Sequence, residues 1–558
     1  MENTYQNRII VIILSALCLL PVFYSCYVWI GQGVPVYMTC SIFALSCTFF
    51  IFPFFLFKIK TAFLINTVWV LLAPLEIMSL YLFQNSIKGG MIFFVLQTNS
   101  REAFEFLSAF RWLVVLYIVI VICYIVVVVK FVKNKPFITN RKWNYTLFTV
   151  TLFIFPLLYV YSYVVASSKQ NKFTHNIKLA GRVYQLKFQK IYPCNACLAL
   201  YNGFSTYANL QDIGSEVENF RFNAQKEKEI DKREVYVFVL GETARYANFG
   251  INGYHRETTP LLRKTDNLIS FSNVLTEANS TGFSLPILLT RSNALNFNLF
   301  KKEKSVTDAF KEAGFQTYWI ANQSFGDAHI QRTVQNVTMS YFTPVDFDDA
   351  SNFDENLWKY LDAVLSKNEK KQFIVIHTLG SHFRYNQRYT DAFKKFVPAL
   401  EGMTDQGTIG EKTKEELINS YDNSILYTDF FLAKTIEKLQ NQHAVSYLYY
   451  ISDHGEGLFD NGVIFHGSLN PPVNEVHIPL FVWYSDDYAQ IYPDKIENVK
   501  NNIDKKISSS LTFHSLLDMA AINIPNDVSM RRSIACGSLQ SDTVRYVINP
   551  EREIKIFK

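Results

Sequence analysis

Three short polar clusters after residue 233 of the 558-residue sequence carry side chains of the types that bind metal ions. Glu242 lies in the first cluster, His382 in the second, and Asp453 and His454 in the third. Each cluster follows an apolar run typical of a strand, and polar groups at the carboxyl ends of neighbouring strands converge in an open α/β sheet. Because zinc accepts carboxylate oxygen and imidazole nitrogen, Glu242, Asp453 and His454 predict a metal centre. The alternative is that each is a hydrogen-bonded polar residue at a strand end.

The elements that must position these clusters follow residue 233. Apolar runs predict five strands, at 235–240, 317–320, 373–376, 447–451 and 479–483. Continuous apolar runs are typical of strands buried on both faces in a parallel sheet covered by helices. Helical patterns at 306–313 and 412–440 have the length of crossover connections. We therefore expect an α/β catalytic domain with a mostly parallel sheet over residues 234–558.

The start of the chain has a different composition, because the apolar runs that raise the hydrophobic fraction to 49% crowd into it. A helix needs about 20 apolar residues to cross about 30 Å of hydrocarbon. Five segments meet that length, at 9–30, 36–57, 61–83, 112–129 and 144–167. With the N-terminus inside, eight Lys and Arg residues fall in inside loops and three outside. We therefore expect a five-helix inner-membrane domain at 1–168, with everything after it in the periplasm, or outside a cell that has no outer membrane.

Three further segments carry separate expectations. Glu76 lies inside the third span, where a carboxyl group is either functional or neutralised against neighbouring helices. Residues 89–110 are too polar to span, and we interpret them as an amphipathic helix at the outer membrane surface, with a plain loop as the alternative. Residues 169–233 are interpreted as a bridging segment of surface helices.

Net charge and cysteine content limit the partners. The net charge of +5 includes no Lys/Arg block in the soluble half, so nucleic-acid binding is not expected. Cys194 and Cys197 are interpreted as a local disulfide or two buried thiols, with a redox pair or a metal clip as alternatives.

The motifs at 241–245, 252–260, 380–382, 452–456 and 466–467 together resemble the phosphoethanolamine transferases of Gram-negative bacteria, in the alkaline phosphatase/sulfatase superfamily. The resemblance covers the whole chain, since that family also has five membrane helices before a periplasmic catalytic domain. It implies one zinc ion, with a second as an alternative, and transfer of phosphoethanolamine from phosphatidylethanolamine to lipopolysaccharide, at lipid A or the core.

The resemblance also implies a threonine nucleophile on the metal, five residues before a proline, and Thr281 stands at that position ahead of Pro286. A hydroxyl is a weak nucleophile, but metal coordination lowers its pKa and a helix N-terminus stabilises the charge that develops. Ser280 and Ser284 are the local competitors. Hydrolysis of sulfate esters is not expected, because this position lacks the Cys/Ser-x-Pro-x-Arg setting of sulfatases.

Other candidates surround this centre. His466 is the predicted general acid, because imidazole titrates near working pH. His382 is predicted to hold the substrate phosphate or a second metal, and for both histidines the alternative is a structural hydrogen bond. Asn322 is predicted to contact phosphoryl oxygens. Arg384 and Arg388 are predicted to bind an acceptor phosphate, with solvated surface groups as the alternative.

Several departures from the family concern the acceptor. The disulfide that staples the threonine segment in lipid A-modifying members is replaced by Glu277 and Ile287, and the stretch 383–385 lacks the usual Gly-Pro. Thr98 and Glu102 match substrate-contacting positions of the family, whereas Phe94 replaces an asparagine. The alternatives to the main hypothesis are a phosphoglycerol transferase of the lipoteichoic-acid-synthase type and a non-catalytic membrane sensor. A non-catalytic sensor would be expected to have lost the metal-binding residues, but they are present.

Overall fold

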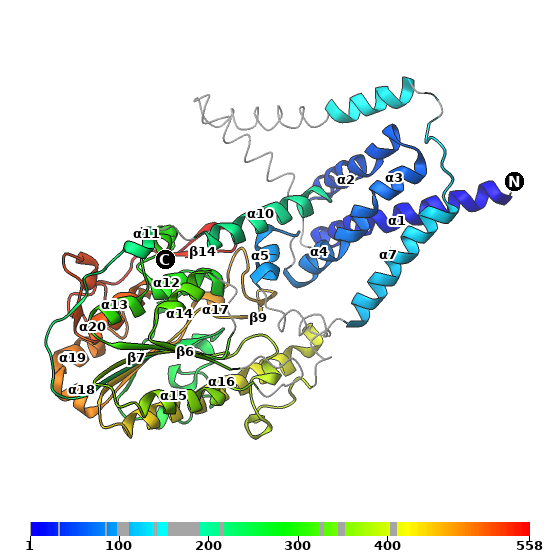
Figure 1. Ribbon diagram of the computed structural model, residues 1–558. Helices are drawn as coiled ribbons and strands as arrows, with labels where there is room; N and C mark the ends of the chain where they lie inside the picture. The colour runs from blue at the N-terminus through cyan, green and yellow to red at the C-terminus, as the bar shows by residue number, and fades with distance from the viewer. Residues whose placement is uncertain are drawn as a thin grey trace. The chain divides into compact units, whose positions relative to one another are not determined.

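The fold is described from a computed structural model of the protein (Figure 1). The structure describes residues 2–31, 34–83, 86–97, 111–138, 140, 142–153, 190–212, 216–323, 328–343, 352–401 and 410–558. The chain divides into two compact units, Met1–Phe93 with Phe110–Ser205 (unit 1) and Phe94–Ala109 with Thr206–Lys558 (unit 2).

Unit 1 is helical. Its helices are α1 (Glu2–Gly31), α2 (Val36–Leu56), α3 (Ile59–Ile65), α4 (Thr67–Phe83), α5 (Gly89–Gln97), α7 (Arg111–Phe131) and the first part of α10 (Cys194–Gln211). Within the described residues, four helical segments are long and apolar enough to cross a membrane: Arg8–Gly31, Val36–Leu56, Ile59–Tyr81 and Arg111–Phe131. They confirm four of the five predicted spans.

The remaining predictions for unit 1 are tested only in part. Residues 142–153 are helical, but most of the predicted span at 144–167 lies outside the described residues. Gly89–Gln97 of the segment predicted as an interfacial helix at 89–110 form α5, whereas residues 98–110, with Thr98 and Glu102, lie outside the described residues, so the amphipathic helix at the membrane surface stays a prediction.

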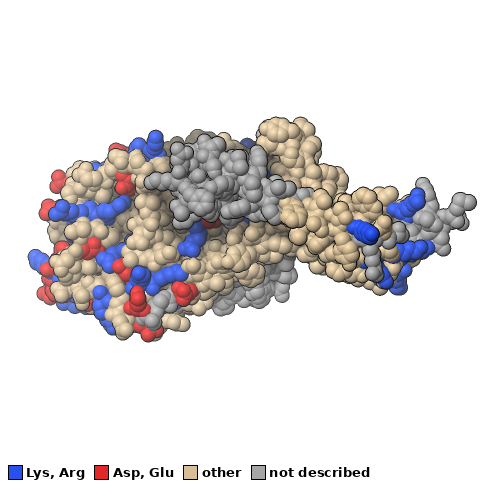
Figure 2. All heavy atoms as spheres, turned by 90° about the horizontal axis from the view of Figure 1, so that it is seen from above, with Lys and Arg blue, Asp and Glu red and all other residues tan. Residues whose placement is uncertain are grey.

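Basic residues gather at one end of unit 1, as Figure 2 shows. The start of α3 and the loop after α7 meet there, since the Ile59 amide donates to the Lys135 carbonyl at 2.8 Å and Lys60 Nζ donates to the Val129 carbonyl at 2.6 Å. This distribution agrees with the predicted set of inside loops.

Glu76 is a fully buried hydrogen-bonded group. Its carboxylate accepts hydrogen bonds from Ser25 Oγ at 3.1 Å, the Ile87 amide at 2.9 Å and Asn195 Nδ2 at 2.7 Å. These donors come from three different segments, so Glu76 joins α1, α4 and α10 within unit 1. Cys194 and Cys197 on α10 are free thiols, half-buried and exposed respectively, so the structure has neither the predicted disulfide nor the predicted pair of buried thiols.

Unit 2 contains a mixed sheet, whose described strands run in the order β3-β11-β8-β2-β7-β5-β6. Their bounds are β2 (Glu234–Gly241), β3 (Leu268–Ser270), β5 (Gln316–Ala321), β6 (Met339–Phe342), β7 (Lys371–His377), β8 (Val445–Ser452) and β11 (Leu480–Tyr484). The five strands from β8 to β6 are mutually parallel.

The expectation that residues 479–483 form a parallel strand is wrong, because β11 runs antiparallel to β8 and pairs antiparallel with β3. The chain between β8 and β11 contains the hairpin of β9 (Gly457–Asp460) and β10 (Val463–Phe465) and the short helix α17 (Val473–Val476). Since it has no helix long enough to return along the sheet, β11 starts at the edge where β8 ends. Burial on both faces made its sequence look like that of a parallel strand.

Helices cover both faces of the sheet (Figure 1). Alternate β2 residues enter the two cores: Phe238 packs in the core that includes residues of α12, α13, α19 and α20, and Val237 in the one that includes residues of α15 and α16. Besides α17, the described α-helices of unit 2 are α11 (Glu216–Asn219), α12 (Thr281–Leu289), α13 (Val306–Glu312), α14 (Ala328–Asn336), α15 (Trp358–Leu365), α16 (Lys414–Gln440), α18 (Asp486–Ile491), α19 (Pro493–Asn501) and α20 (Thr512–Met519). The helices predicted at 306–313 and 412–440 are confirmed as α13 and α16. Short strand pairs complete the unit: β1 (Gln225–Lys226) with β13 (Ile522–Asn523), β4 (Val274–Leu275) with β12 (Ile507–Ser508), and β14 (Arg545–Ile548) with β15 (Ile554–Phe557).

Candidate active site

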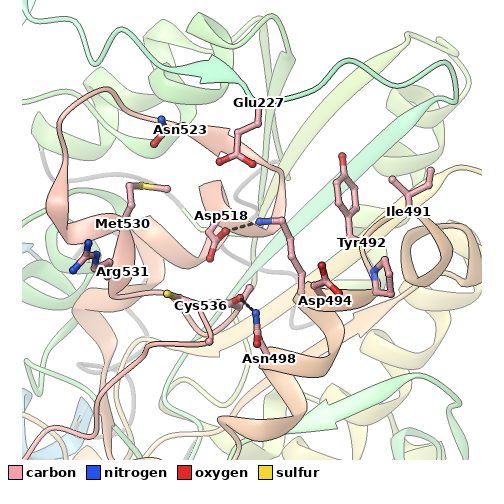
Figure 3. A pocket seen from close by; sticks show the side chains of 14 residues that line it. Glu227, Ile491, Tyr492, Asp494, Asn498, Asp518, Asn523, Met530, Arg531 and Cys536 are labelled. Atoms are coloured by element: carbon pink, nitrogen blue, oxygen red, sulfur yellow. Dashed lines mark hydrogen bonds and ion pairs between the residues drawn. The ribbon is translucent and has the colours of Figure 1, made fainter.

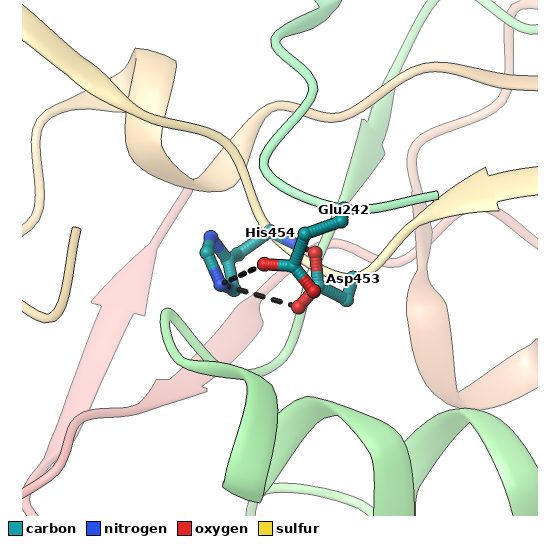
Figure 4. Close-up of side chains that lie close together, drawn as sticks. All are labelled: Glu242, Asp453 and His454. Atoms are coloured by element: carbon teal, nitrogen blue, oxygen red, sulfur yellow. Dashed lines mark hydrogen bonds and ion pairs between the residues drawn. The ribbon is translucent and has the colours of Figure 1, made fainter. Parts of the chain in front are cut away.

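The structure brings Glu242, Asp453 and His454 together at the carboxyl ends of β2 and β8 (Figure 4). These strands are neighbours in the sheet, which is why residues so far apart in sequence meet. One ligand atom from each residue lies within 4.8 Å of the other two. His454 Nε2 is 3.1 Å from Asp453 Oδ2 and 3.6 Å from Glu242 Oε1. We call these three residues the metal group.

The metal group fits a zinc ion. All three side chains are buried, and the buried Asp453 Oδ2 accepts no hydrogen bond from any residue that the structure describes. Burial raises the pKa of the Asp453 carboxyl; burial alone would lower the pKa of His454, but the charges of Asp453 and Glu242 outweigh it and raise that pKa. Two buried carboxylates beside one imidazole are costly without a cation, and two oxygens with one nitrogen are a donor set that zinc accepts.

Thr281 is the first residue of α12 and lies beside the metal group. Its Oγ1 is 3.3 Å from Glu242 Oε1 and 3.2 Å from His454 Nε2. Of the two competing serines, Ser284 donates its hydroxyl to the Ala278 carbonyl at 3.0 Å, and Ser280 Oγ is buried without a hydrogen-bond partner among the described residues. Thr281 is therefore the hydroxyl of this segment that the geometry favours.

Two residues to which sequence reasoning assigned no role support Glu242. Thr243 has φ of 60°, an uncommon conformation for a β-branched residue, and donates its Oγ1 to Glu242 Oε1 at 2.8 Å and its amide to Asp453 Oδ1 at 3.0 Å. Gln323 donates Nε2 to Glu242 Oε2 at 3.2 Å and to the Thr378 carbonyl at 2.7 Å. One sequence signal pointed to Gln323, namely its position directly after Asn322, a predicted contact residue that follows β5.

The loop that carries His382 lies directly against Glu242. The Ser381 amide donates to the Glu242 carbonyl at 3.1 Å. Gly380 has φ of +51°, and a Cβ there would lie 2.8 Å from the same carbonyl oxygen. Asp354 holds this loop from the other side by accepting the amides of Leu379 at 2.8 Å and Gly380 at 2.9 Å. The loop from β7 is thus fixed beside the metal group.

His466 also lies beside the metal group. Its ring centroid is 4.1 Å from that of His454, and its Nδ1 is 3.3 Å from Glu456 Oε1. Burial and the positive charge of His454 hold the pKa of His466 well below its usual value. Burial also raises the pKa of Glu456 to about 8. His466 is thus a neutral imidazole near pH 7, and its predicted acid role requires that it first take up a proton.

Asn322 lies where β5 ends, but its amide is engaged inside the fold. Its Nδ2 donates to Asp354 Oδ1 at 2.9 Å and to the Asn352 carbonyl at 3.0 Å, and its Oδ1 accepts the Thr343 hydroxyl at 2.6 Å. These bonds fix Asn322, directly after β5, to residues 343, 352 and 354. The predicted contact of Asn322 with phosphoryl oxygens stays a prediction.

Arg384 and Arg388 are buried, with 1% and 6% exposure, so the alternative that they are solvated surface groups is wrong. Arg388 Nη2 donates to the Phe383 carbonyl at 2.8 Å and its Nε to the His382 carbonyl at 3.2 Å. Arg388 thus supports the main chain of the His382 loop. Binding of an acceptor phosphate by the two arginines stays a prediction.

A separate hollow in unit 2 contains none of these residues (Figure 3). Its lining includes Glu227, Cys536, Asn498 and the ion pair of Lys495 Nζ with Asp518 Oδ1 at 2.6 Å. Since charges of both signs line it and the described pair is internally satisfied, the hollow offers no alternative chemical centre.

The family of the protein follows from comparison with known proteins. Residues 234–522, more than half of the chain, match the family model described as Sulfatase, and the protein belongs to the sulfatase family. The matched region contains the metal group and Thr281.

Within that family the chain is similar to phosphoethanolamine transferases. Phosphoethanolamine transferase EptC of Escherichia coli is 26% identical over 532 residues, covering 91% of this chain and 88% of that protein. The C-terminal periplasmic domain of EptC from Escherichia coli in complex with zinc is 28% identical with a TM-score of 0.54, covering 60% of this chain and 95% of that chain. The integral membrane lipooligosaccharide phosphoethanolamine transferase A of Neisseria meningitidis has a TM-score of 0.71 at 23% identity, covers 95% of this chain and 99% of that chain, and shows the shared fold. The predicted resemblance and fold class are confirmed.

Proposed function

We propose that the protein is a zinc-dependent phosphoethanolamine transferase that moves phosphoethanolamine from phosphatidylethanolamine to lipopolysaccharide through Thr281. The observation that carries this proposal is the position of Thr281 Oγ1, 3.2 Å from His454 Nε2 and 3.3 Å from Glu242 Oε1. A hydroxyl at that position lies within reach of a metal ion held by the metal group.

The nucleophile is activated by its surroundings. A zinc ion held by Glu242, Asp453 and His454 would draw charge from the Thr281 hydroxyl and lower its pKa. Thr281 also begins the nine-residue helix α12, whose N-terminal amides favour negative charge. Both effects would lower the pKa of the Thr281 hydroxyl relative to that of a threonine hydroxyl in water, and so favour the alkoxide.

The reaction has two balanced steps. In the first, Thr281 Oγ forms a bond to phosphorus, the bond between phosphorus and the diacylglycerol oxygen breaks, and that oxygen takes a proton. In the second, an acceptor oxygen forms a bond to phosphorus, the bond to Thr281 Oγ breaks, and the acceptor proton passes to the protein. His466 is neutral at rest, so we assign it to accept the Thr281 proton and then to donate it to the leaving oxygen.

The similar proteins support the proposed location and the proposed acceptor. Four apolar helices and relatives whose C-terminal domains are described as periplasmic support an inner-membrane protein with unit 2 in the periplasm. The relative from Neisseria meningitidis is named for lipooligosaccharide, which supports a glycolipid acceptor. His382, Arg384 and Arg388 belong to the loop that follows β7, and we propose that this loop binds the acceptor or the donor phosphate. We also propose Thr98 and Glu102 as substrate contacts.

The experiment is mass spectrometry of lipopolysaccharide from cells that express the wild type, Thr281→Ala or Ser284→Ala. Ser284 is the matched control, because its hydroxyl lies in the same helix and donates to the Ala278 carbonyl. We expect a phosphoethanolamine addition with the wild type and Ser284→Ala and none with Thr281→Ala. A phosphoglycerol addition would identify the alternative transferase, and no addition with the wild type would contradict the proposed acceptor.

A further inference from the structure

Three segments of the active site meet at one buried carboxylate, that of Glu475 on α17, which is 0% exposed. Its Oε2 accepts hydrogen bonds from Asn279 Nδ2 at 2.7 Å and from Ser468 Oγ at 2.8 Å. Asn279 stands two residues before Thr281, and Ser468 stands two residues after His466. The carboxylate therefore joins the segment of the nucleophile to the loop of the proton-transferring histidine.

The main chain of α17 holds the third segment, which carries Asp453 and His454. The Gly455 amide donates to the Glu475 carbonyl at 2.8 Å, and the Glu456 amide donates to the Asn474 carbonyl at 3.2 Å. A Cβ at Gly455 would lie 2.1 Å from the Asn474 carbonyl oxygen, so the two segments are in close contact. Glu475 is thus fixed to the metal loop by its main chain and to the other two segments by its side chain.

Asn279 is well placed to transmit this constraint. Its Nδ2 donates to the Ser468 carbonyl at 2.8 Å as well as to Glu475, so both of its donor hydrogens are engaged. Thr281 and His454 lie 173 positions apart in the sequence but 3.2 Å apart in space, so their distance depends on such cross-links. A displacement of about 1 Å in a reacting group costs about 100-fold in rate.

We propose that Glu475 is a positioning residue that sets the place of Thr281 against the metal group, by holding Asn279 and Ser468. The proposal rests on the proposed function, because the rate it affects is that of phosphoethanolamine transfer. Glu475 itself touches neither the metal group nor the reacting atoms through its side chain, and it acts through Asn279.

The test compares variants of the full-length protein in detergent, with phosphatidylethanolamine as donor. Glu475→Met keeps the side-chain length but removes the acceptor, and we expect kcat to fall about 100-fold with KM changed less than about 3-fold. Glu475→Gln keeps one acceptor oxygen for Asn279 and Ser468, so we expect it to retain kcat within about 5-fold. Rescue by Gln and loss with Met separate an acceptor role from simple packing.

A role reversal tests the pair directly. Asn279→Asp places a carboxylate against Glu475, and we expect a loss similar to that of Glu475→Met. In the double variant Asn279→Asp with Glu475→Gln, the amide of the new side chain at position 475 donates to the new carboxylate at position 279. We expect kcat of this double variant to recover at least about 10-fold relative to Asn279→Asp alone. Asp429→Leu is the control for loss of a buried carboxylate elsewhere, since Asp429 accepts the amides of Leu261 and Leu262 at 2.9 and 2.8 Å. It lowers the melting temperature without changing kcat.

Hydrogen exchange of the peptide around residues 276–285 gives a second readout that needs no substrate. We expect faster exchange there in Glu475→Met and Asn279→Asp, and wild-type exchange in the combined variant. The proposal is overturned if Glu475→Met keeps wild-type kcat, or if the combined variant recovers nothing. If the wild type transfers no phosphoethanolamine, the proposed function fails, and hydrogen exchange alone tests the positioning role. Protection that is lost in Glu475→Met and Asn279→Asp and regained in the combined variant supports the role. Unchanged exchange overturns it.

Discussion

Gly380→Ala is a small change that acts on the metal group through the main chain. Gly380 has φ of +51°, and an added Cβ would lie 2.8 Å from the carbonyl oxygen, 3.1 Å from the amide nitrogen and 3.2 Å from Cβ of Glu242. Ordinary contacts of this kind begin at 3.4 Å. Either Glu242 or the loop that carries His382 must therefore move by a few tenths of an ångström.

The size of the effect follows from two terms. An alanine in the left-handed region costs about 1 kcal/mol, and overpacking of a dense site adds about 1–3 kcal/mol. Gly253→Ala is the matched control, because Gly253 has φ of +93° and nothing lies within 4 Å of its added Cβ. Gly253→Ala therefore has only the backbone cost, so the difference in unfolding free energy between the two variants isolates the contact with Glu242.

The assay is zinc affinity by competition with a chelator, together with thermal unfolding. We expect Gly380→Ala to bind zinc about 10 to 100-fold more weakly than the wild type, as for other changes behind a metal ligand, and to unfold earlier than Gly253→Ala. Gly253→Ala keeps wild-type zinc affinity. Equal zinc affinity in the wild type and Gly380→Ala would refute the reasoning that this loop fixes Glu242.

Three further predictions concern metal, pH and the supporting amide. Removal of zinc by a chelator is expected to lower the melting temperature, because Glu242 and Asp453 lose their cation. Zinc at 100-fold excess over its Kd restores about 2.7 kcal/mol of unfolding free energy. Calorimetry with and without zinc checks this. Burial raises the pKa of Asp429 from 3.8 to about 7, so its contribution to stability is full below pH 3.8 and is lost as the pH rises to about 7. The wild type therefore loses about 3 kcal/mol of unfolding free energy between pH 5 and pH 8 relative to Asp429→Asn, which unfolding of both proteins at the two pH values checks. Gln323→Leu removes the donor to Glu242 Oε2, and we expect zinc affinity to fall about 10-fold with little change in KM; unchanged affinity would exclude Gln323 as a support.

The metal group was predictable from the sequence because its chemistry depends on local order. Glu242 and Asp453 each follow a buried strand directly, and His454 comes next after Asp453. Parallel neighbouring strands bring their carboxyl ends to one edge of the sheet. Thr281 was located only through the resemblance and its distance to a proline, since no strand precedes it directly. Its contact with His454 depends on tertiary packing of α12.

The supporting residues were not predictable, because they are identified only by the partners they meet. Glu475 lies in a short helix far from the nucleophile in sequence, and Gln323 gives no periodic signal. The antiparallel direction of β11 was missed for a similar reason, since burial on both faces gives the same apolar run in either direction. Thr98 and Glu102 lie outside the described residues and stay predictions.

The central claim is that Thr281 carries phosphoethanolamine during transfer, and peptide mass spectrometry of the acid-quenched full-length protein tests it most directly. The protein is incubated with phosphatidylethanolamine and zinc without an acceptor, beside Thr281→Ala and Ser284→Ala. The account predicts one phosphoethanolamine on the peptide that contains Thr281 in the wild type and Ser284→Ala, and none in Thr281→Ala. A modification on another residue, or undiminished modification in Thr281→Ala, would contradict it.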